Sequence, residues 1–249
     1  MRVSDIPVCP IMGVDVAAVD MDYTLDYVAN NLDTLRGNYI CVTNVHTVVT
    51  SYRDAEYAAV QNGSAFCTPD GKPLSVVGRK RGHEGMDRVA GPDLMGRVFA
   101  DERFAERSHY FYGSTQETLD LLEQKLGEAY PGLKIAGMYS PPFRKLTEEE
   151  RAADLARINA SNADFLWVGL GAPKQERWMA ANEGKVDALM IGVGAGFDYF
   201  AGNIKRAPMW MQKAGLEWLY RLMQDPKRLF SRYVTTNASF IYNAVLLGR

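Results

Sequence analysis

The 249-residue chain is predicted to form an α/β fold: a mainly parallel sheet with helices on both faces, followed by a helical C-terminal segment. Apolar runs suited to buried strands alternate with segments of helical period up to about residue 192, a pattern typical of βαβ units. Beyond that residue the pattern is helical to the end, and the balance of charge changes sign. We therefore expect an α/β domain over residues 1–204 and a basic helical appendage over residues 205–249.

The strands are expected where apolar residues run without a break, because both faces of a parallel sheet are covered. In chain order these runs are "YICVTN", "SAFCTPDG", "SHYFYGS", "LKIAGMYS", "ADFLWVGLG" and "VDALMIGVGAG". Segments of helical period precede, separate and follow them: "YTLDYVANNLDTL", "TVVTSYRDAEYAAVQNG", "KPLSVVGRK", "GPDLMGRVFADERF", "TQETLDLLEQKLGEAY", "TEEERAADLARINAS" and the residues after Pro173. Pro92 and Pro173 suit the first turn of a helix, where the missing N–H would be unpaired anyway.

The stretch "VGLGAPKQERW" (168–178) predicts a tight turn from a buried strand into a helix. In an open α/β sheet such turns line the crevice at the carboxyl ends of the strands. The free N–H groups of the helix start attract anions. We therefore expect an anion near Pro173.

Composition indicates a globular protein, with 47% hydrophobic and 23% charged residues. The three cysteines are widely spaced and odd in number, which argues against a disulfide framework and for a reducing compartment. The histidines show no metal-ligand spacing, so we expect no structural zinc. The N-terminal stretch lacks the apolar core of a signal peptide, which favours a cytoplasmic location.

Charge is unevenly distributed along the chain. Residues 205–249 hold eight Lys or Arg against two acidic residues, a net charge of +6, which leaves −8 for residues 1–204 out of the overall −2. This asymmetry indicates an anionic partner: a membrane surface, nucleic acid or a phosphorylated substrate. The uncharged stretch "YVTTNASFIYNAVLLG" is shorter than the roughly 20 apolar residues that span a bilayer, so it can lie on a membrane without crossing it.

Two familiar motifs are weak in this chain. Gly192 and Gly194 begin a G-x-G-x-x-G pattern, but residue 197 is Phe and no acidic residue follows at the ribose-binding distance. Asp20 and Asp22 have the D-x-D spacing of metal-dependent sugar-nucleotide transferases. Because a helix follows them directly, we favour a helix cap and a first-turn carboxylate over a metal site.

Asp70 and a set of C-terminal arginines are stronger candidates. Asp70 in "CTPDGKPL" follows a buried strand, so it is either a turn residue or a catalytic carboxylate in the crevice. Arg221, Arg228 and Arg232 fall near one helical face if Pro226 only kinks that segment. A solvated face is one interpretation; because few acids accompany them, we favour phosphate binding.

Five motifs in order resemble the WecG/TagA/CpsF family of bacterial glycosyltransferases: "RVAGPDL", "GLGAPKQE", "GVGAGFD", "RAPMWMQKAGLEWLYRL" and "DPKRLFSRY". The resemblance covers nearly the whole chain. It implies transfer of N-acetylmannosamine or a related hexose from a UDP-sugar to a polyprenyl-diphosphate-linked sugar, with inversion, in teichoic acid or surface polysaccharide synthesis. It implies a catalytic Rossmann-like domain, an appendage that closes the site at the membrane, and no tightly held metal or cofactor.

The resemblance also implies roles for individual residues. The general base falls on Asp70, beside the active-site residues Asn44 and Thr43. The substrate-binding residues would be Arg88, Gln175, Lys174, Asp198, Arg206, Arg221, Arg228 and Arg232. Two positions depart from the family pattern, because many members have threonine where this chain has Val42, and Arg232 lies one position from the third arginine of some members. "YSPPF" occurs in only part of the family, which leaves the sugars open.

The partners expected are therefore a UDP-sugar donor, a lipid-linked acceptor and an anionic membrane surface, with no nucleic acid. We expect the protein in the cytoplasm, attached peripherally to the inner face of the cell membrane. Oligomeric state stays open, with a homo-oligomer among the alternatives. Two other classes are weighed: a Rossmann-like oxidoreductase or methyltransferase, and a non-enzymatic protein that binds membrane surfaces. Should Asp70 be a turn residue, Asp198 is the next candidate for the base.

Overall fold

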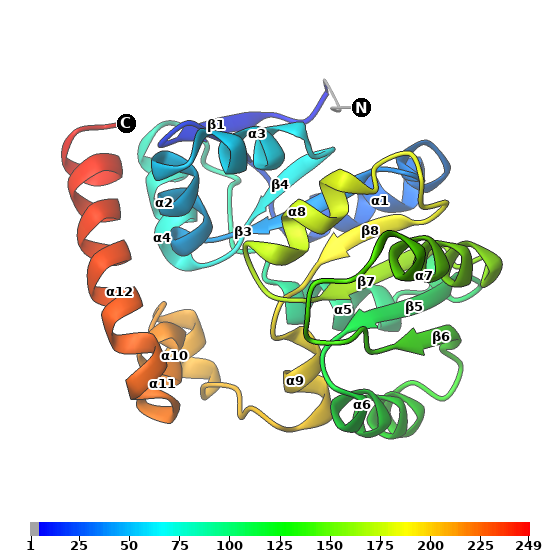
Figure 1. Cartoon of the computed structure of the whole chain (residues 1–249). Helices are drawn as coiled ribbons and strands as arrows, with labels where there is room; N and C mark the ends of the chain where they lie inside the picture. Colours follow the sequence, from blue (N-terminus) through cyan, green and yellow to red (C-terminus); the bar gives the residue numbers. More distant parts are fainter. Residues whose placement is uncertain (1–4) are drawn as a thin grey trace.

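The computed structural model describes residues 5–249, without the side chains of Lys213, Arg228 and Arg232. Its centre is an eight-stranded sheet in the order β1-β2-β4-β3-β8-β7-β5-β6, parallel except for the β1–β2 pair (Figure 1). The strands are β1 (Val8–Ile11), β2 (Val14–Ala17), β3 (Tyr39–Thr43), β4 (Phe66–Pro69), β5 (Ser108–Gly113), β6 (Lys134–Tyr139), β7 (Phe165–Gly169) and β8 (Leu189–Gly192). The predicted α/β fold class is confirmed.

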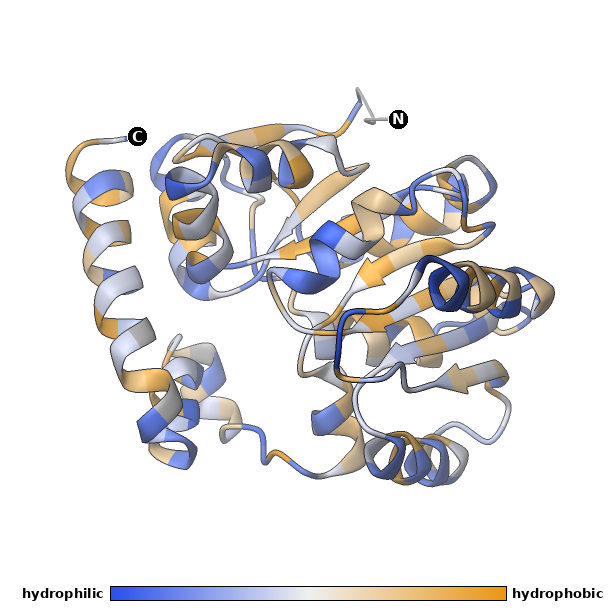
Figure 2. Ribbon diagram, in the orientation of Figure 1, coloured by the Kyte–Doolittle hydropathy of each residue, from blue (hydrophilic) through white to orange (hydrophobic). Residues whose placement is uncertain are grey.

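Helices pack on both faces of this sheet, because its inner strands are apolar on both sides. In β7, Phe165 and Trp167 join one buried cluster, whereas Leu166 and Val168 join the other. Hydrophobic colouring runs along the central strands, and the helices are mixed (Figure 2). The helices of the α/β domain are α1 (Met21–Leu35), α2 (Val45–Arg53), α3 (Ala55–Gly63), α4 (Lys72–Lys80), α5 (Gly91–Ala100), η1 (Glu102–Phe104), α6 (Gln116–Ala129), α7 (Glu148–Ala160), α8 (Lys174–Ala181) and α9 (Gly196–Ala201).

The C-terminal segment is helical, as expected, and consists of α10 (Met209–Lys213), α11 (Glu217–Gln224), α12 (Pro226–Phe240) and a π-helical turn, η2 (Ile241–Leu246). Helix α12 runs beside α2 (Figure 1). Phe240 and Ala244 are 3% exposed and belong to the buried cluster on the α2 side of the sheet. Within residues 5–249, no helix is both long and apolar enough to cross a membrane.

Several boundaries differ from the sequence prediction. The single helix expected over "TVVTSYRDAEYAAVQNG" is two helices, because the Asp54 carboxylate accepts from Tyr57 N at 3.0 Å and starts α3. Pro173 is the N-cap of α8 and not part of its first turn. The assumption that Pro226 only kinks one helix was wrong: α11 ends before Asp225, and Pro226 begins α12, where its missing N–H costs no hydrogen bond.

The β1–β2 hairpin was not anticipated. Its two-residue turn places Met12 at φ 50° and Gly13 at φ 86°. Two successive positive φ angles suit the right-handed twist of a hairpin, but methionine is an unusual residue for the first of them. The turn therefore lacked the Asn-Gly or Asp-Gly signal that identifies such hairpins in a sequence.

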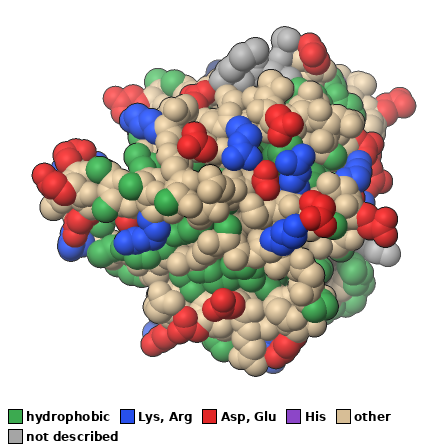
Figure 3. All heavy atoms as spheres, turned by 90° about the vertical axis from the view of Figure 1, so that its right-hand side faces the viewer, with side chains coloured by type: hydrophobic (Ala, Val, Ile, Leu, Met, Phe, Trp, Pro, Cys, Tyr) green, Lys and Arg blue, Asp and Glu red, His purple; other side chains and the backbone are tan. Residues whose placement is uncertain are grey.

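The face at the right of Figure 1 shows acidic and basic side chains interspersed rather than gathered by sign (Figure 3). This is the side where β6 forms the sheet edge. The features that bear on function lie elsewhere, between the carboxyl ends of the strands and the C-terminal helices.

Candidate functional site

A cavity of about 920 Å³ opens at the carboxyl ends of the central strands. Its walls include Asn44 after β3, Asp70 after β4, Gly171 after β7 and Val193 after β8. Residues of the C-terminal helices close it from the other side, among them Trp218 of α11. The cavity thus occupies the crevice in which open α/β sheets bind ligands.

Asp70 is the carboxylate at the centre of this crevice. Its backbone N–H donates to the Thr43 carbonyl at 2.6 Å, which joins the ends of β4 and β3. The next residue, Gly71, has φ +99°, a conformation that glycine adopts easily because it has no Cβ. The chain turns sharply there into α4. The strand end and this turn hold the Asp70 carboxyl against the cavity.

Burial raises the pKa of Asp70 to about 6, the largest effect on this carboxyl. Arg88 and Arg221 oppose the rise through their positive charge, and the Asn44 side chain opposes it by hydrogen bonding, whereas Glu217 adds to it. A carboxyl with a pKa of about 6 is mostly ionised at neutral pH yet is a stronger base than an exposed aspartate. Asp70 is therefore suited to accept a proton.

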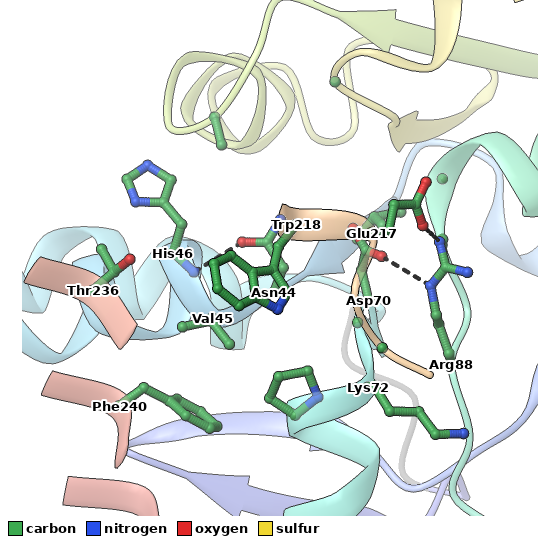
Figure 4. Close-up of a pocket in the computed structure, with 18 of the residues that line it drawn as sticks. Asn44, Val45, His46, Asp70, Lys72, Arg88, Glu217, Trp218, Thr236 and Phe240 are labelled. Carbon is green, nitrogen blue, oxygen red and sulfur yellow. Dashed lines mark hydrogen bonds and ion pairs between the residues drawn. The ribbon is translucent and has the colours of Figure 1, made fainter. Parts of the chain in front are cut away.

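Asn44 orients its amide toward Asp70 because its carbonyl is already used. As the N-cap of α2, its Oδ1 accepts from His46 N at 3.0 Å and Thr47 N at 3.2 Å. That leaves the Nδ2 group as the donor for the Asp70 carboxyl. Figure 4 shows Asn44 and Asp70 together beside Trp218.

Arg88 connects the site to the appendage. Its Nη2 donates to Glu217 Oε2 of α11 at 2.5 Å, and its Nε lies 3.9 Å from Asp70 Oδ1 (Figure 4). Arg206 bonds both oxygens of Asp93 and lies 3.5 Å from Glu217. In this cluster each guanidinium group lies between carboxylates, and the residues come both from the α/β domain and from the C-terminal segment.

Arg221 lines the cavity without such a partner. Its guanidinium carbon lies 5.6 Å from the centre of the Tyr199 ring. Among the described residues, no carboxylate oxygen comes within 4.0 Å of its nitrogens. A guanidinium held over an aromatic ring and not paired with an acid is available to an incoming phosphate.

Gln175 ties together the two loops that follow β7 and β8. Its Oε1 accepts from Gly171 N at 3.1 Å and from Gly194 N at 3.0 Å. Its Nε2 donates to Glu176 Oε1 at 2.8 Å, and burial raises the pKa of Glu176. Gln175 lines the cavity, but its hydrogen bonds serve mainly to hold these loops in place.

The structure brings Asn44, Asp70, Arg88, Gln175 and Arg221 to one cavity. Other predicted site residues do not line it. Thr43 is fully buried and donates to Gln61 Oε1 at 2.6 Å; Lys174 is exposed; Asp198 accepts from Asn203 at 3.3 Å; and Arg206 is occupied by Asp93. Arg228 and Arg232 lie in α12, and their side chains are outside the described part of the chain.

Glu217, Trp218 and Tyr199 line the cavity but were not predicted from the sequence. Glu217 had a usable signal, since it is one of only two acids in residues 205–249. The two aromatic residues carried no comparable signal, because aromatic side chains at helical spacing usually serve the core.

The D-x-D motif is accounted for by helix α1. Asp20 is its N-cap and accepts from Tyr23 N at 2.8 Å, and Asp22 pairs with Arg97 at 2.6 Å. Neither residue is among those that line the cavity. The interpretation of this motif as a cap and a first-turn carboxylate is confirmed.

Comparisons with known proteins show what this chain is similar to. The model of the glycosyl transferase WecG/TagA/CpsF family matches residues 9–248. An N-acetylglucosaminyldiphosphoundecaprenol N-acetyl-beta-D-mannosaminyltransferase of Bacillus subtilis is 31% identical over 206 residues, covering 82% of this chain and 78% of that protein. A protein of the same name from Bacillus spizizenii is 31% identical over 198 residues, covering 79% of this chain and 75% of its own length.

Proposed function

The chain belongs to the WecG/TagA/CpsF family of glycosyl transferases, and we propose that it transfers N-acetylmannosamine or a related hexose from a UDP-sugar to a polyprenyl-diphosphate-linked sugar. The names of the two relatives support an N-acetylglucosaminyl acceptor and an N-acetylmannosaminyl group. The observation that carries the proposal is a cavity that holds a half-buried carboxylate of raised pKa beside Arg88 and Arg221.

The reaction needs a base and a means of stabilising the departing anion. An acceptor hydroxyl has a pKa far above 7, so Asp70 takes its proton while the oxygen bonds to the anomeric carbon. The bond from that carbon to the β-phosphate oxygen breaks, and its electron pair leaves with UDP. Attack opposite the leaving group inverts the anomeric configuration. Protonated Asp70 then releases its proton to solvent.

Positive charge near the β-phosphate stabilises the leaving group. We assign this role to Arg221, which has no acidic partner among the described residues, and to Arg88. Asn44 positions the base, and Gln175 holds the loops at the helix start of α8. Arg228 and Arg232 are proposed for the diphosphate on the resemblance alone.

The appendage suits work at a membrane surface, where a polyprenyl-linked acceptor resides. Exposed apolar side chains on its helices include Met209, Trp210, Met223, Phe230 and Val234. The same segment carries the net charge of +6. Apolar and basic groups together favour an anionic interface, which supports peripheral association with the inner face of the membrane.

A product assay tests this function. The full chain is incubated with each UDP-hexosamine and with N-acetylglucosaminyl-diphosphate joined to a short polyprenyl chain, and mass spectrometry follows UDP and the disaccharide lipid. We expect an N-acetylmannosaminyl donor to give UDP and disaccharide in equal amounts, and turnover to persist in EDTA. The absence of product with every donor, together with tight binding of NADH or S-adenosylmethionine, would favour an oxidoreductase or methyltransferase instead.

A further inference from the structure

The cavity continues well beyond Asp70 into a second arm. This apolar arm lies between α2 and α4 on one side and α12 with η2 on the other, and its apolar lining is Val45, Val76, Val77, Phe240, Ile241 and Val245. Figure 4 shows Val45 and Phe240 on one side of Asp70, with Arg88 and Glu217 on the other. The ion pair of Arg88 and Glu217 therefore lies toward one end of a single continuous cavity, and the aliphatic side chains of the arm lie toward the other.

Apolar side chains in this arm remain uncovered. Val76 is 38% exposed, Ile241 53% and Val245 45%, although all three face the cavity. Water against such a surface is unfavourable, and a concave apolar wall is usual where an apolar ligand binds. The cavity volume, about 920 Å³, lies near the upper end of the roughly 300–1,000 Å³ usual for one small-molecule site. There is room for a ligand that extends past the polar end.

We propose that the apolar arm binds the first isoprenyl units of the acceptor, those next to its diphosphate. The inference rests on the proposed function, which places the acceptor's sugar hydroxyl at Asp70 and the donor's diphosphate near Arg88 and Arg221. The acceptor's own diphosphate then lies on the opposite side of Asp70 from Arg88. An isoprenyl chain that leaves this point needs an apolar path, and the arm begins beside it. Polar groups also line the arm: His46 of α2, Lys80 and Arg81 at the C-terminal end of α4, and Thr236 and Asn237 of α12 (Figure 4).

Through the arm the protein recognises the isoprenyl units of the acceptor, which a soluble sugar diphosphate lacks. Burying each methylene of the chain favours binding, so affinity should rise with the first isoprenyl units and level off once the arm is filled. The remaining chain stays in the bilayer. Specificity for a lipid-linked acceptor would then come from the protein as well as from the membrane.

Neighbouring residues on η2 provide matched variants. Ile241 and Val245 line the arm, whereas Tyr242 and Leu246, 58% and 70% exposed, do not. Ile241→Gln and Val245→Gln place an amide in the arm, and Tyr242→Gln and Leu246→Gln place it outside. All four sites are exposed, so the fold should survive; circular dichroism and melting temperature check this for each variant.

Binding is measured first, without membrane or detergent, by titrating geranyl diphosphate and methyl diphosphate and following tryptophan fluorescence. We expect the wild type to bind the geranyl compound about tenfold or more tightly than the methyl compound. Ile241→Gln and Val245→Gln should remove most of that difference, and the two control variants should keep it. Equal affinity of the wild type for both compounds, or equal loss in arm and control variants, would overturn the proposal.

Transfer is measured separately, with N-acetylglucosaminyl-diphosphate carrying either a methyl or a geranyl group. The arm variants should raise KM for the geranyl acceptor about tenfold and leave kcat/KM for the methyl acceptor near the wild-type value. A wild type that binds geranyl diphosphate in the arm but transfers to neither acceptor contradicts the proposed function alone. A wild type that transfers equally well to both contradicts the apolar arm alone.

Discussion

At the scale of single residues, the site is built from polar side chains located immediately after the strands. Asn44 and Asp70 come directly after β3 and β4, and the carboxyl ends of neighbouring parallel strands share one edge. Their proximity could therefore be predicted from the sequence. The pKa of Asp70 could not, because it depends on burial and on Glu217 from a helix far along the chain.

Glu217→Gln tests this electrostatic coupling. The Glu217 charge raises the pKa of Asp70, so the substitution should lower that pKa. The acidic limb of the turnover–pH profile should therefore move to lower pH. Glutamine keeps an oxygen that can accept from Arg88, which limits loosening of α11.

Glu117→Gln is the control for this prediction, since Glu117 is an exposed acid in the first turn of α6 and does not line the cavity. Its profile should coincide with that of the wild type. An acidic limb that stays in place or moves upward in Glu217→Gln would show that Glu217 does not act on Asp70.

At the scale of elements, Gln175 at the start of α8 fixes the loops after β7 and β8. The close packing extends to Gly192, where an added Cβ would lie 2.9 Å from Gln175 Nε2 and 2.8 Å from Met179 Cε. A larger residue at position 192 would have to displace the end of the Gln175 or Met179 side chain. This contact explains one glycine of "GVGAG" by packing and not by nucleotide binding.

Gln175→Ala should damage both stability and turnover. It leaves the N–H groups of Gly171 and Gly194 without an acceptor and removes the partner of Glu176. We expect a loss of about 1–3 kcal/mol in the free energy of unfolding, measured by urea denaturation. Turnover should fall about tenfold or more, because the loops at the helix start lose their alignment.

Gln116→Ala makes the same chemical change in the first turn of α6, where Gln116 is exposed and its side chain donates to Asp120 of the same helix. It should change the free energy of unfolding by less than about 0.5 kcal/mol and leave turnover intact. Similar losses in both variants would show that Gln175 has no special role in the loops.

Element boundaries show where local sequence signals were insufficient. The helix break at Asp54 depends on a capping bond that competes with continuation of the helix, and the periodicity of residues 45–63 does not reveal which of the two prevails. Pro226 was compatible with a kink or a new helix, and the structure has a new helix. Arg221 therefore lies on a different helix from Arg228 and Arg232.

At the scale of the whole molecule, alternation of strands and helices predicted the fold and the crevice, but not the contacts between distant segments. Arg88 and Glu217 are separated by 129 positions, and Arg206 and Asp93 by 113. The sequence does not reveal such pairs, because their partners lie far apart along the chain. The acid that pairs with Arg206, for example, comes from α5. We propose that residues 1–204 form the catalytic domain and residues 205–249 complete its site.

The central claim is that Asp70 is the general base, and turnover against pH tests it most directly when wild type and Asp70→Asn are compared. Wild-type turnover should rise as pH increases through about 6, because the carboxyl must be ionised. Asp70→Asn should lower turnover by roughly 100-fold or more above pH 7, where the wild-type carboxyl is ionised, and should remove that rise.

Melting temperature on the same preparations separates catalysis from folding. Burial raises the pKa of Asp70 above its ordinary value, so its ionisation opposes folding as pH rises from about 4 to above 6. Asp70→Asn should therefore melt at or slightly above the wild-type temperature at pH 7.5. Turnover near the wild-type level across the whole pH range, in a variant that melts normally, would contradict the account and make Asp70 a turn residue.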